Sequence, residues 1–220
     1  MLDTLESEVL LPLVEGRDVL ELGCGTGLIL DRVQGACRTL VGLDISRGML
    51  ERAASRGHRV LQASVERLPF RSESFDVVFS FKVLAHVPDI RTTLSEAHRV
   101  LRPGGYLVAE FYNPWSLRGL IKKFGPARRV AEDTHERHVY TRFDGPKQVR
   151  RLLEPVFVVE GFRGIRVLTP WSGLFRLPGA TGPLTWAERL AGRTPGLWRL
   201  GGFLVAVARK KARSGLGRDG

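Results

Sequence analysis

Cysteine is scarce in this sequence, and long apolar runs are missing from it. The 220 residues include two cysteines, Cys24 and Cys37, too few for a disulfide framework or a four-cysteine zinc site. We therefore expect a reducing compartment and a cytoplasmic protein. No apolar run reaches about 18 residues, so no transmembrane helix is expected. Asp3, Glu6 and Glu8 stand where a secretion signal would be basic and then apolar.

Acidic side chains are scarce in one half of the chain only. The sequence has 34 Lys and Arg against 23 Asp and Glu, a net charge of +11. Residues 1–110 hold 13 basic and 15 acidic side chains, a net of −2, whereas residues 111–220 hold 21 and 8, a net of +13. Apolar residues make up 43% of the chain, enough for a sizeable core. The charge of the second half therefore needs an explanation of its own.

The first half alternates short β-rich runs with helical patterns. The expected strands are Asp18–Leu22, Thr39–Leu43, Arg59–Gln62, Phe75–Ser80 and Tyr106–Phe111. The expected helices are Leu28–Val33, a segment capped by Ser46 that runs to Ala54, and Ile90–Leu101, which Pro103–Gly105 would stop. This alternation predicts a parallel sheet with helices on both faces.

The second half is less regular. Helical patterns occur at Leu117–Phe124, Gln148–Leu153 and Leu184–Leu190, and strand composition at Val156–Val167 and Gly202–Ala208. We expect one domain over residues 1–220. It would consist of a cofactor-binding half (1–111), a cap insertion after strand five (112–155), the last strands with a helix (156–208) and a frayed basic tail (209–220).

A glycine-rich turn gives the sharpest signal. The segment Val19–Gly27 reads VLELGCGTG, a strand that ends in an acidic residue and runs into Gly-x-Gly-x-Gly before a helix. Glycines there let the backbone turn tightly and approach a ligand. The rival dinucleotide fingerprint needs a glycine where this sequence has Leu28. Asp44 ends the second strand at the position where a carboxylate accepts hydrogen bonds from ribose hydroxyls.

Five segments together resemble the class I S-adenosylmethionine-dependent methyltransferases, in particular the type 11, small-molecule branch with the ubiquinone and menaquinone methyltransferases. They are Val19–Gly27, Val41–Ser46, Glu66–Phe70, Phe75–Asp89 and Arg99–Leu107, and they follow the family's order and spacing. The resemblance implies a Rossmann-like, doubly wound α/β fold. Its sheet would have seven mostly parallel strands, with the cap insertion after strand five.

The resemblance also implies S-adenosylmethionine as the cofactor and a set of residues that bind it. That set is Glu21, Gly23, Cys24, Gly25, Gly27, Asp44, Ile45, Met49, Ser64, Val65 and Phe81. In it Glu21 would hold the glycine loop and the methionine amine, Asp44 the ribose, and Ile45 the adenine. Ser64 departs from the family, which usually has an acidic residue there. A hydroxyl is a weaker acceptor for the adenine amino group.

Methyl transfer to an acceptor mainly requires alignment, with a base where the acceptor must lose a proton. The candidate catalytic residues are His86, Tyr112, His138 and Tyr140. His86 has an alternative interpretation, a structural histidine that fixes the turn after it. Tyr112 and the neighbouring Asn113 could touch either substrate or a nearby loop. His135 and His138 are too few for a metal site, and none is expected.

These patterns favour an enzyme that methylates a small molecule on oxygen, nitrogen or carbon. A non-catalytic cofactor-binding subunit and an RNA methyltransferase are the alternatives. Only Leu5–Val14 precedes the first strand, so the cofactor site would be open unless the cap compensates. For the basic half, nucleic acid is the weaker hypothesis because no RNA-binding module is visible. Peripheral membrane contact through Leu117–Lys123 and Leu174–Leu177, an acidic or hydrophobic acceptor, and a merely solvated surface stay open.

Overall fold

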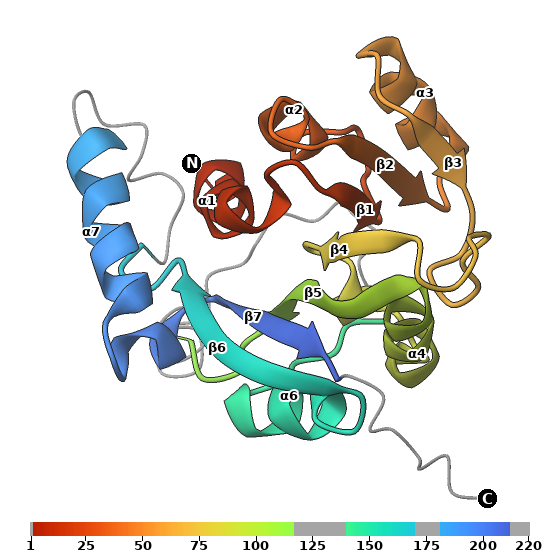
Figure 1. The fold of residues 1–220 in the computed structure, drawn as a ribbon. Helices are drawn as coiled ribbons and strands as arrows, with labels where there is room; N and C mark the ends of the chain where they lie inside the picture. Colours follow the sequence, from red (N-terminus) through yellow and green to blue (C-terminus); the bar gives the residue numbers. More distant parts are fainter. Residues whose placement is uncertain (1, 117–139, 170–180, 212–220) are drawn as a thin grey trace, which may run out of the picture.

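The computed structural model describes residues 2–116, 140–169 and 181–211, and within them seven strands form one sheet (Figure 1). The strand order is β3-β2-β1-β4-β5-β7-β6. The strands are β1 (Asp18–Leu22), β2 (Thr39–Asp44), β3 (Val60–Gln62), β4 (Phe75–Ser80), β5 (Leu101–Tyr112), β6 (Phe157–Ile165) and β7 (Phe203–Lys210).

The pairing of the strands confirms the predicted doubly wound, mostly parallel sheet. β1 pairs in parallel with β2 and β4, β2 with β3, and β4 with β5. β7 is antiparallel to both of its neighbours, β5 and β6. The carboxyl ends of β1, β2 and β4 therefore lie at one edge of the sheet, where ligands bind in open α/β folds.

Helices cover both faces of the sheet. They are α1 (Leu2–Val14), α2 (Leu30–Val33), α3 (Arg47–Ser55), α4 (Ile90–Val100), α6 (Pro146–Leu153) and α7 (Thr181–Arg193), with single 3₁₀ turns η1 (Leu84–His86) and η4 (Leu197–Leu200). α1, α2 and α7 lie on one face, and α4 and α6 on the other (Figure 1). A hydrophobic core lies on each face of the sheet. Alternate side chains of β1 point into the two cores: Val19 packs on the α1 side and Leu20 on the α4 side.

Three sequence expectations need correction at the ends of elements. Helix α4 ends at Val100, and Leu101 already pairs with Phe75 as part of β5. Pro103–Gly105 thus lie inside β5, at a shift in register, and do not stop the helix. Ser46 occupies the N-cap of α3, but its side chain makes no capping bond. β7 extends through Arg209 and Lys210, so the tail begins two residues later than expected.

Helix α1 is an element that the sequence analysis did not predict. Its apolar residues Leu5, Leu10 and Val14 are buried against the sheet. Within the described ranges, no helix has the length and apolar composition needed to cross a bilayer. The predicted helix Leu117–Phe124, the residue His138 and most of the cap insertion lie outside the described residues.

Candidate functional site

The glycine loop follows β1 with three residues in the left-handed region, Gly23, Gly25 and Gly27, at φ +75°, +53° and +82°. A Cβ on Gly23 would lie 2.2 Å from the Val83 side chain, so only glycine lets the loop after β4 pack this closely. The amides of Gly23 and Cys24 both donate to the Leu43 carbonyl, at 2.6 and 2.9 Å. The loop is thus fixed between the ends of β2 and β4.

Asp44, at the end of β2, holds the loop by its carboxylate. Its Oδ2 accepts a hydrogen bond from the Gly25 N–H at 2.8 Å, and its Oδ1 accepts one from the Ser46 N–H at 2.8 Å. Each carboxylate oxygen has a second lone pair, so both can still accept a bond from a ligand hydroxyl. Asp44 therefore orders the site before any ligand binds.

A cavity of about 330 Å³ opens between the glycine loop, the β2 end and the loops after β3 and β4. Five residues of the predicted cofactor set line it: Gly23, Asp44, Ile45, Ser64 and Val65. The predicted catalytic residue His86 lines it as well. Ile45 lines the cavity and its side chain is 73% exposed, whereas Met49, 43% exposed, lies in α3 and is not one of the lining residues.

Three carboxyl groups are buried on the α1 side of the sheet, Glu6 of α1, Glu21 of β1 and Glu110 of β5. Burial raises the pKa of Glu21 well above its ordinary value, and the nearby carboxylates of Glu6 and Asp44 raise it further. Burial likewise raises the pKa of Glu6 and Glu110. Glu21 Oε2, only two residues before Gly23, has no hydrogen-bond partner among the described residues.

Lys82 joins α1 to the loop that lines the cavity. Its Nζ lies 2.9 Å from a Glu6 carboxylate oxygen and 3.1 Å from Asp3 Oδ1, and its backbone N–H donates to Glu110 Oε1 at 3.1 Å. Burial lowers the pKa of Lys82, but its ion pair with Glu6 outweighs burial and leaves the pKa raised. The short N-terminal segment is thus held against the cofactor side by a partly buried ion pair.

On the acceptor side, the structure brings together three of the four predicted catalytic residues. His86 Nδ1 lies 3.1 Å from the Tyr140 carbonyl oxygen, and His86 Nε2 lies 3.5 Å from the Tyr112 hydroxyl. The rings of His86 and Tyr112 meet edge to face at 5.6 Å. Among the described residues, the hydrogen-bond contacts of the His86 side chain go to residues 112, 140 and 141, and none goes to the turn after it.

Asn113, in contrast, is bound to a neighbouring loop, the segment of η4. Its side-chain amide donates to the carbonyl oxygens of Arg199 and Gly201, at 2.7 and 2.8 Å. The side chain is buried and has no room for a substrate.

Residues 20–109 match the methyltransferase domain family. A probable S-adenosylmethionine-dependent methyltransferase of Mycolicibacterium smegmatis is 34% identical over 153 residues, 68% of this chain and 55% of that protein. The chain therefore carries a methyltransferase domain over residues 20–109. The demethylmenaquinone methyltransferase of Lactococcus lactis is 40% identical over 103 residues, 42% of this chain and 41% of that protein.

A Thermotoga maritima crystal structure, described as a methyltransferase of this family and a possible histamine N-methyltransferase, shares the methyltransferase fold. Its TM-score is 0.66 at 24% identity, over 95% of this chain and 89% of that one. The chain spans about half or less of the curated relatives it matches, with 55%, 21% and 42% of the first three covered.

The residues around the cavity fit S-adenosylmethionine. S-adenosylmethionine has a cationic amino-acid end, a ribose and a flat adenine. A buried, unpartnered carboxylate oxygen on Glu21 suits a cation, and the uncovered side chain of Ile45 suits an aromatic ring. The side chains of Cys24 and Phe81 are buried in the core, so each could reach the cofactor only through its backbone.

Several residues of the methyltransferase site were missed by sequence reasoning. Lys82, Val83 and Glu66 line the cavity, and Glu110 lies behind it. Asp3 and Glu6, three residues apart among helical apolar positions, were a signal for an amphipathic helix with an acidic edge.

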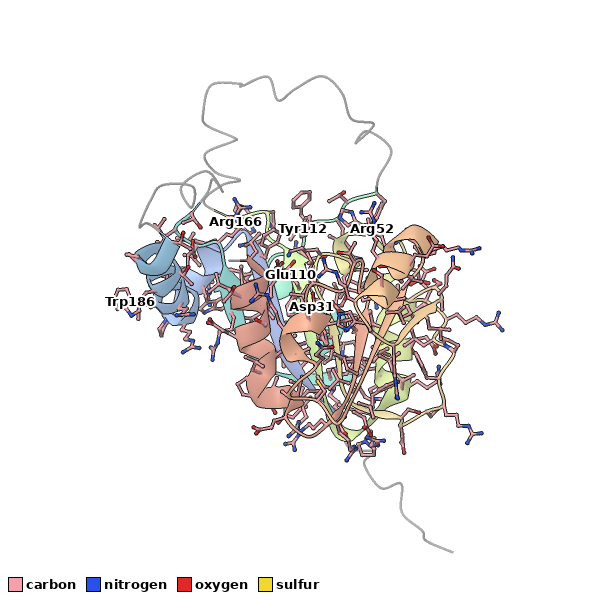
Figure 2. The ribbon with its side chains drawn as sticks, turned by 90° about the horizontal axis from the view of Figure 1, so that it is seen from above. Asp31, Arg52, Glu110, Tyr112, Arg166 and Trp186 are labelled. Carbon is pink, nitrogen blue, oxygen red and sulfur yellow. The ribbon has the colours of Figure 1, made fainter. Side chains whose placement is uncertain are left out.

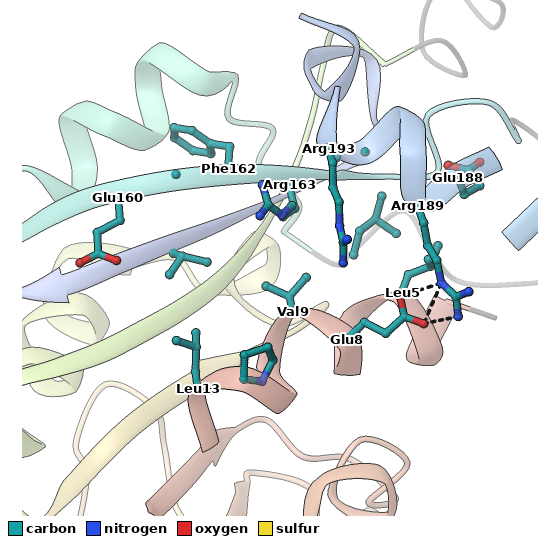
Figure 3. A pocket seen from close by; sticks show the side chains of 16 residues that line it. Leu5, Glu8, Val9, Leu13, Glu160, Phe162, Arg163, Glu188, Arg189 and Arg193 are labelled. Atoms are coloured by element: carbon teal, nitrogen blue, oxygen red, sulfur yellow. Dashed lines mark hydrogen bonds and ion pairs between the residues drawn. The ribbon is translucent and has the colours of Figure 1, made fainter. Parts of the chain in front are cut away.

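A larger cavity of about 390 Å³ lies elsewhere, between α1, β6 and α7 (Figure 3), and contains none of the predicted site residues.

Proposed function

We propose that this chain transfers the methyl group of S-adenosylmethionine to a small-molecule acceptor held beside His86 and Tyr112. The observation that carries the proposal is the position of His86. It lines the same cavity as Gly23 and Asp44, and it contacts Tyr112 and Tyr140 on the acceptor side.

Residues at the carboxyl ends of β1 and β2 would bind the cofactor. Glu21 would accept from the cofactor's ammonium, Asp44 from the ribose hydroxyls, and Ile45 would cover one face of the adenine. When bound, the cofactor supplies a methyl group on a positively charged sulfur. The protein's task is then to place a nucleophile in line and to keep water out.

His86 is placed to take the proton that an acceptor hydroxyl or amine must lose. The Tyr140 carbonyl can only accept a hydrogen bond, and the Thr141 hydroxyl, 3.3 Å from Nδ1, can accept one as well, so we place the proton of neutral His86 on Nδ1. Nε2 is then unprotonated and turned toward Tyr112. At 3.5 Å the Tyr112 hydroxyl is too far for a strong bond, which leaves Nε2 accessible to an acceptor proton.

A small-molecule acceptor is supported by the kind of relatives found, among them the demethylmenaquinone methyltransferase. It is also supported by the cavity, whose volume of about 330 Å³ is that of a small-molecule site. The proton-accepting position of His86 favours an acceptor oxygen or nitrogen over carbon.

The test uses methyl-labelled S-adenosylmethionine and pools of small hydroxyl and amine compounds. We expect label transfer that His86→Ala lowers about 100-fold, the scale of general-base catalysis, with unchanged affinity for the cofactor. Label transfer that His86→Ala leaves unchanged would overturn the role of His86. A complete absence of transfer from a chain that binds the cofactor would overturn the enzyme assignment for these acceptors.

A further inference from the structure

The outward side of α7 exposes large apolar side chains that no described element covers. Trp186 is 65% exposed and Leu190 is 57% exposed. They are four residues apart and so lie one above the other on the helix. Trp186 projects from the rim of the molecule (Figure 2). Single exposed apolar residues are ordinary, but a tryptophan and a leucine in one row form a patch.

The 3₁₀ turn η4 continues this patch. Leu197 is 42% exposed and Leu200 is 36% exposed, and η4 packs against α7. The four apolar residues Trp186, Leu190, Leu197 and Leu200 are called the α7–η4 face below.

The inner sides of α7 and η4 are fully engaged, so the exposed side chains do not result from loose packing. Glu188 is 1% exposed and accepts bonds from the amides of residues 167–169. The Trp198 ring stacks on Phe162 at 5.1 Å. A Cβ on Gly164 would lie 2.4 Å from the Trp198 carbonyl oxygen, so glycine permits this close approach. The α7–η4 face is therefore presented on a fixed support.

The exposed charges of α7 and η4 themselves are cationic. The two elements contain Arg189, Arg193 and Arg199, and their acidic residue, Glu188, is buried. Arg193 extends into the groove between α1, β6 and α7, which Glu8 and Glu160 also line (Figure 3). Arg189 is bound to Glu8, whereas Arg193 and Arg199 make no ion pair among the described residues. Arg193, three residues after Leu190, and the exposed Arg199 are therefore the cations beside the apolar face.

We propose that the α7–η4 face docks on an anionic lipid surface. Tryptophan and leucine insert at the boundary between head groups and acyl chains, and arginine beside them reaches the lipid phosphates. A basic segment is attracted to anionic lipid by about 1 kcal/mol for each cation near the surface.

The docking surface adjoins the acceptor side of the molecule. Asn113 ties the loop after β5 to the carbonyls of Arg199 and Gly201, and the Tyr112 ring packs on Phe203 at 5.2 Å. If the proposed function holds, an acceptor dissolved in the membrane would reach His86 from this side. Docking itself does not rest on that function.

The test is co-sedimentation with vesicles of phosphatidylglycerol and phosphatidylcholine in equal parts, compared with vesicles of phosphatidylcholine alone. We expect binding to the anionic vesicles only, weaker at high salt. The double variant Trp186→Ser/Leu190→Ser should bind about tenfold more weakly. Arg193→Gln/Arg199→Gln should lower binding to anionic vesicles by a similar factor.

Matched controls come from the other edge of the sheet. Leu61→Ser replaces an apolar residue of β3 that is 40% exposed, and Arg52→Gln/Arg59→Gln removes two exposed cations. Both should bind as the wild type does. Failure of the wild type to bind would overturn the proposal, as would equal binding by the double variant. A dimer in sedimentation equilibrium that Trp186→Ser dissociates, with no vesicle binding, would assign the face to a second copy of the chain instead.

Discussion

His86 illustrates how a single backbone group can decide the chemistry of a side chain. The Tyr140 carbonyl fixes the tautomer, and the fixed tautomer turns an unprotonated Nε2 toward the acceptor side. Without that carbonyl the ring could present either nitrogen. The proposed role of His86 as a base therefore requires the segment that contains Tyr140 to be in place.

Tyr112 should assist His86 without binding the cofactor. Burial raises the pKa of the Tyr112 hydroxyl, and the nearby Glu110 raises it further, so this hydroxyl stays protonated and can donate. We expect Tyr112→Phe to lower turnover about tenfold, since a single hydrogen bond is worth about 1 kcal/mol. Calorimetry should show unchanged affinity for S-adenosylmethionine. Turnover equal to wild type would remove Tyr112 from the acceptor site.

The two cysteines should be inert in the folded chain. Burial raises the pKa of Cys24 to about 12 and that of Cys37 to about 11, so neither forms the reactive thiolate near neutral pH. A colorimetric thiol reagent should react slowly with the native protein and with both thiols in urea. Fast labelling of the native chain would show that the glycine loop opens.

Single site residues could be predicted from the sequence where a residue type suited to the ligand stands at a fixed distance after a strand. The glycine loop and Asp44 follow strands at fixed distances, and the structure places them around one cavity. Lys82 and Glu110 were not predicted as part of the site, because their partner Glu6 is 76 and 104 residues away along the chain. Contacts that form only across the folded sheet leave no local pattern.

At the scale of elements, α1 depends on Lys82 for its position. We expect Lys82→Met to destabilise the protein by about 1–2 kcal/mol, because it leaves the buried Glu6 carboxylate unpaired while Lys82 itself is partly exposed to solvent. Hydrogen exchange should speed up in α1 more than in β4.

The control for the Lys82 variant is Asp3→Asn, which removes the more exposed of its two partners. Its effect should be below about 0.5 kcal/mol, as for a surface ion pair. An equal loss of protection in both variants would contradict a special role for Glu6.

The elements themselves were predicted well where the apolar pattern is dense. All seven strands were expected, and β4 shows why, since its side chains are buried on both faces. The start of β5 was missed because Pro103, Gly104 and Gly105 look like a turn, whereas Leu101 pairs with β4 before an irregular stretch. α1 was missed because its apolar pattern is interrupted by Pro12 and by the buried polar residues Glu6 and Ser7.

At the scale of the whole molecule, the buried carboxyl groups make stability depend on pH. Glu110 faces Glu6, Lys82 and Tyr112, and burial holds its pKa well above 4.5 in the folded chain. The folded chain therefore keeps a proton that the unfolded chain loses above that pH. Glu110 therefore lowers the free energy of unfolding as the pH rises from 4.5 to its raised pKa in the folded chain.

Glu110→Gln has no such proton to lose. Across a pH series from 4.5 upward, we expect its free energy of unfolding to fall less steeply than that of the wild type, as measured by urea titration. Parallel curves for the two proteins would mean that Glu110 titrates normally when folded.

The central claim is that the loop after β1 and the carboxylate after β2 together bind S-adenosylmethionine. Isothermal titration of the wild type and of Asp44→Ala tests it most directly. We expect one equivalent of cofactor to bind the wild type, and the variant to bind at least about tenfold more weakly, a loss of about 1.4 kcal/mol. Equal affinities, or no binding by the wild type at millimolar cofactor, would contradict the account.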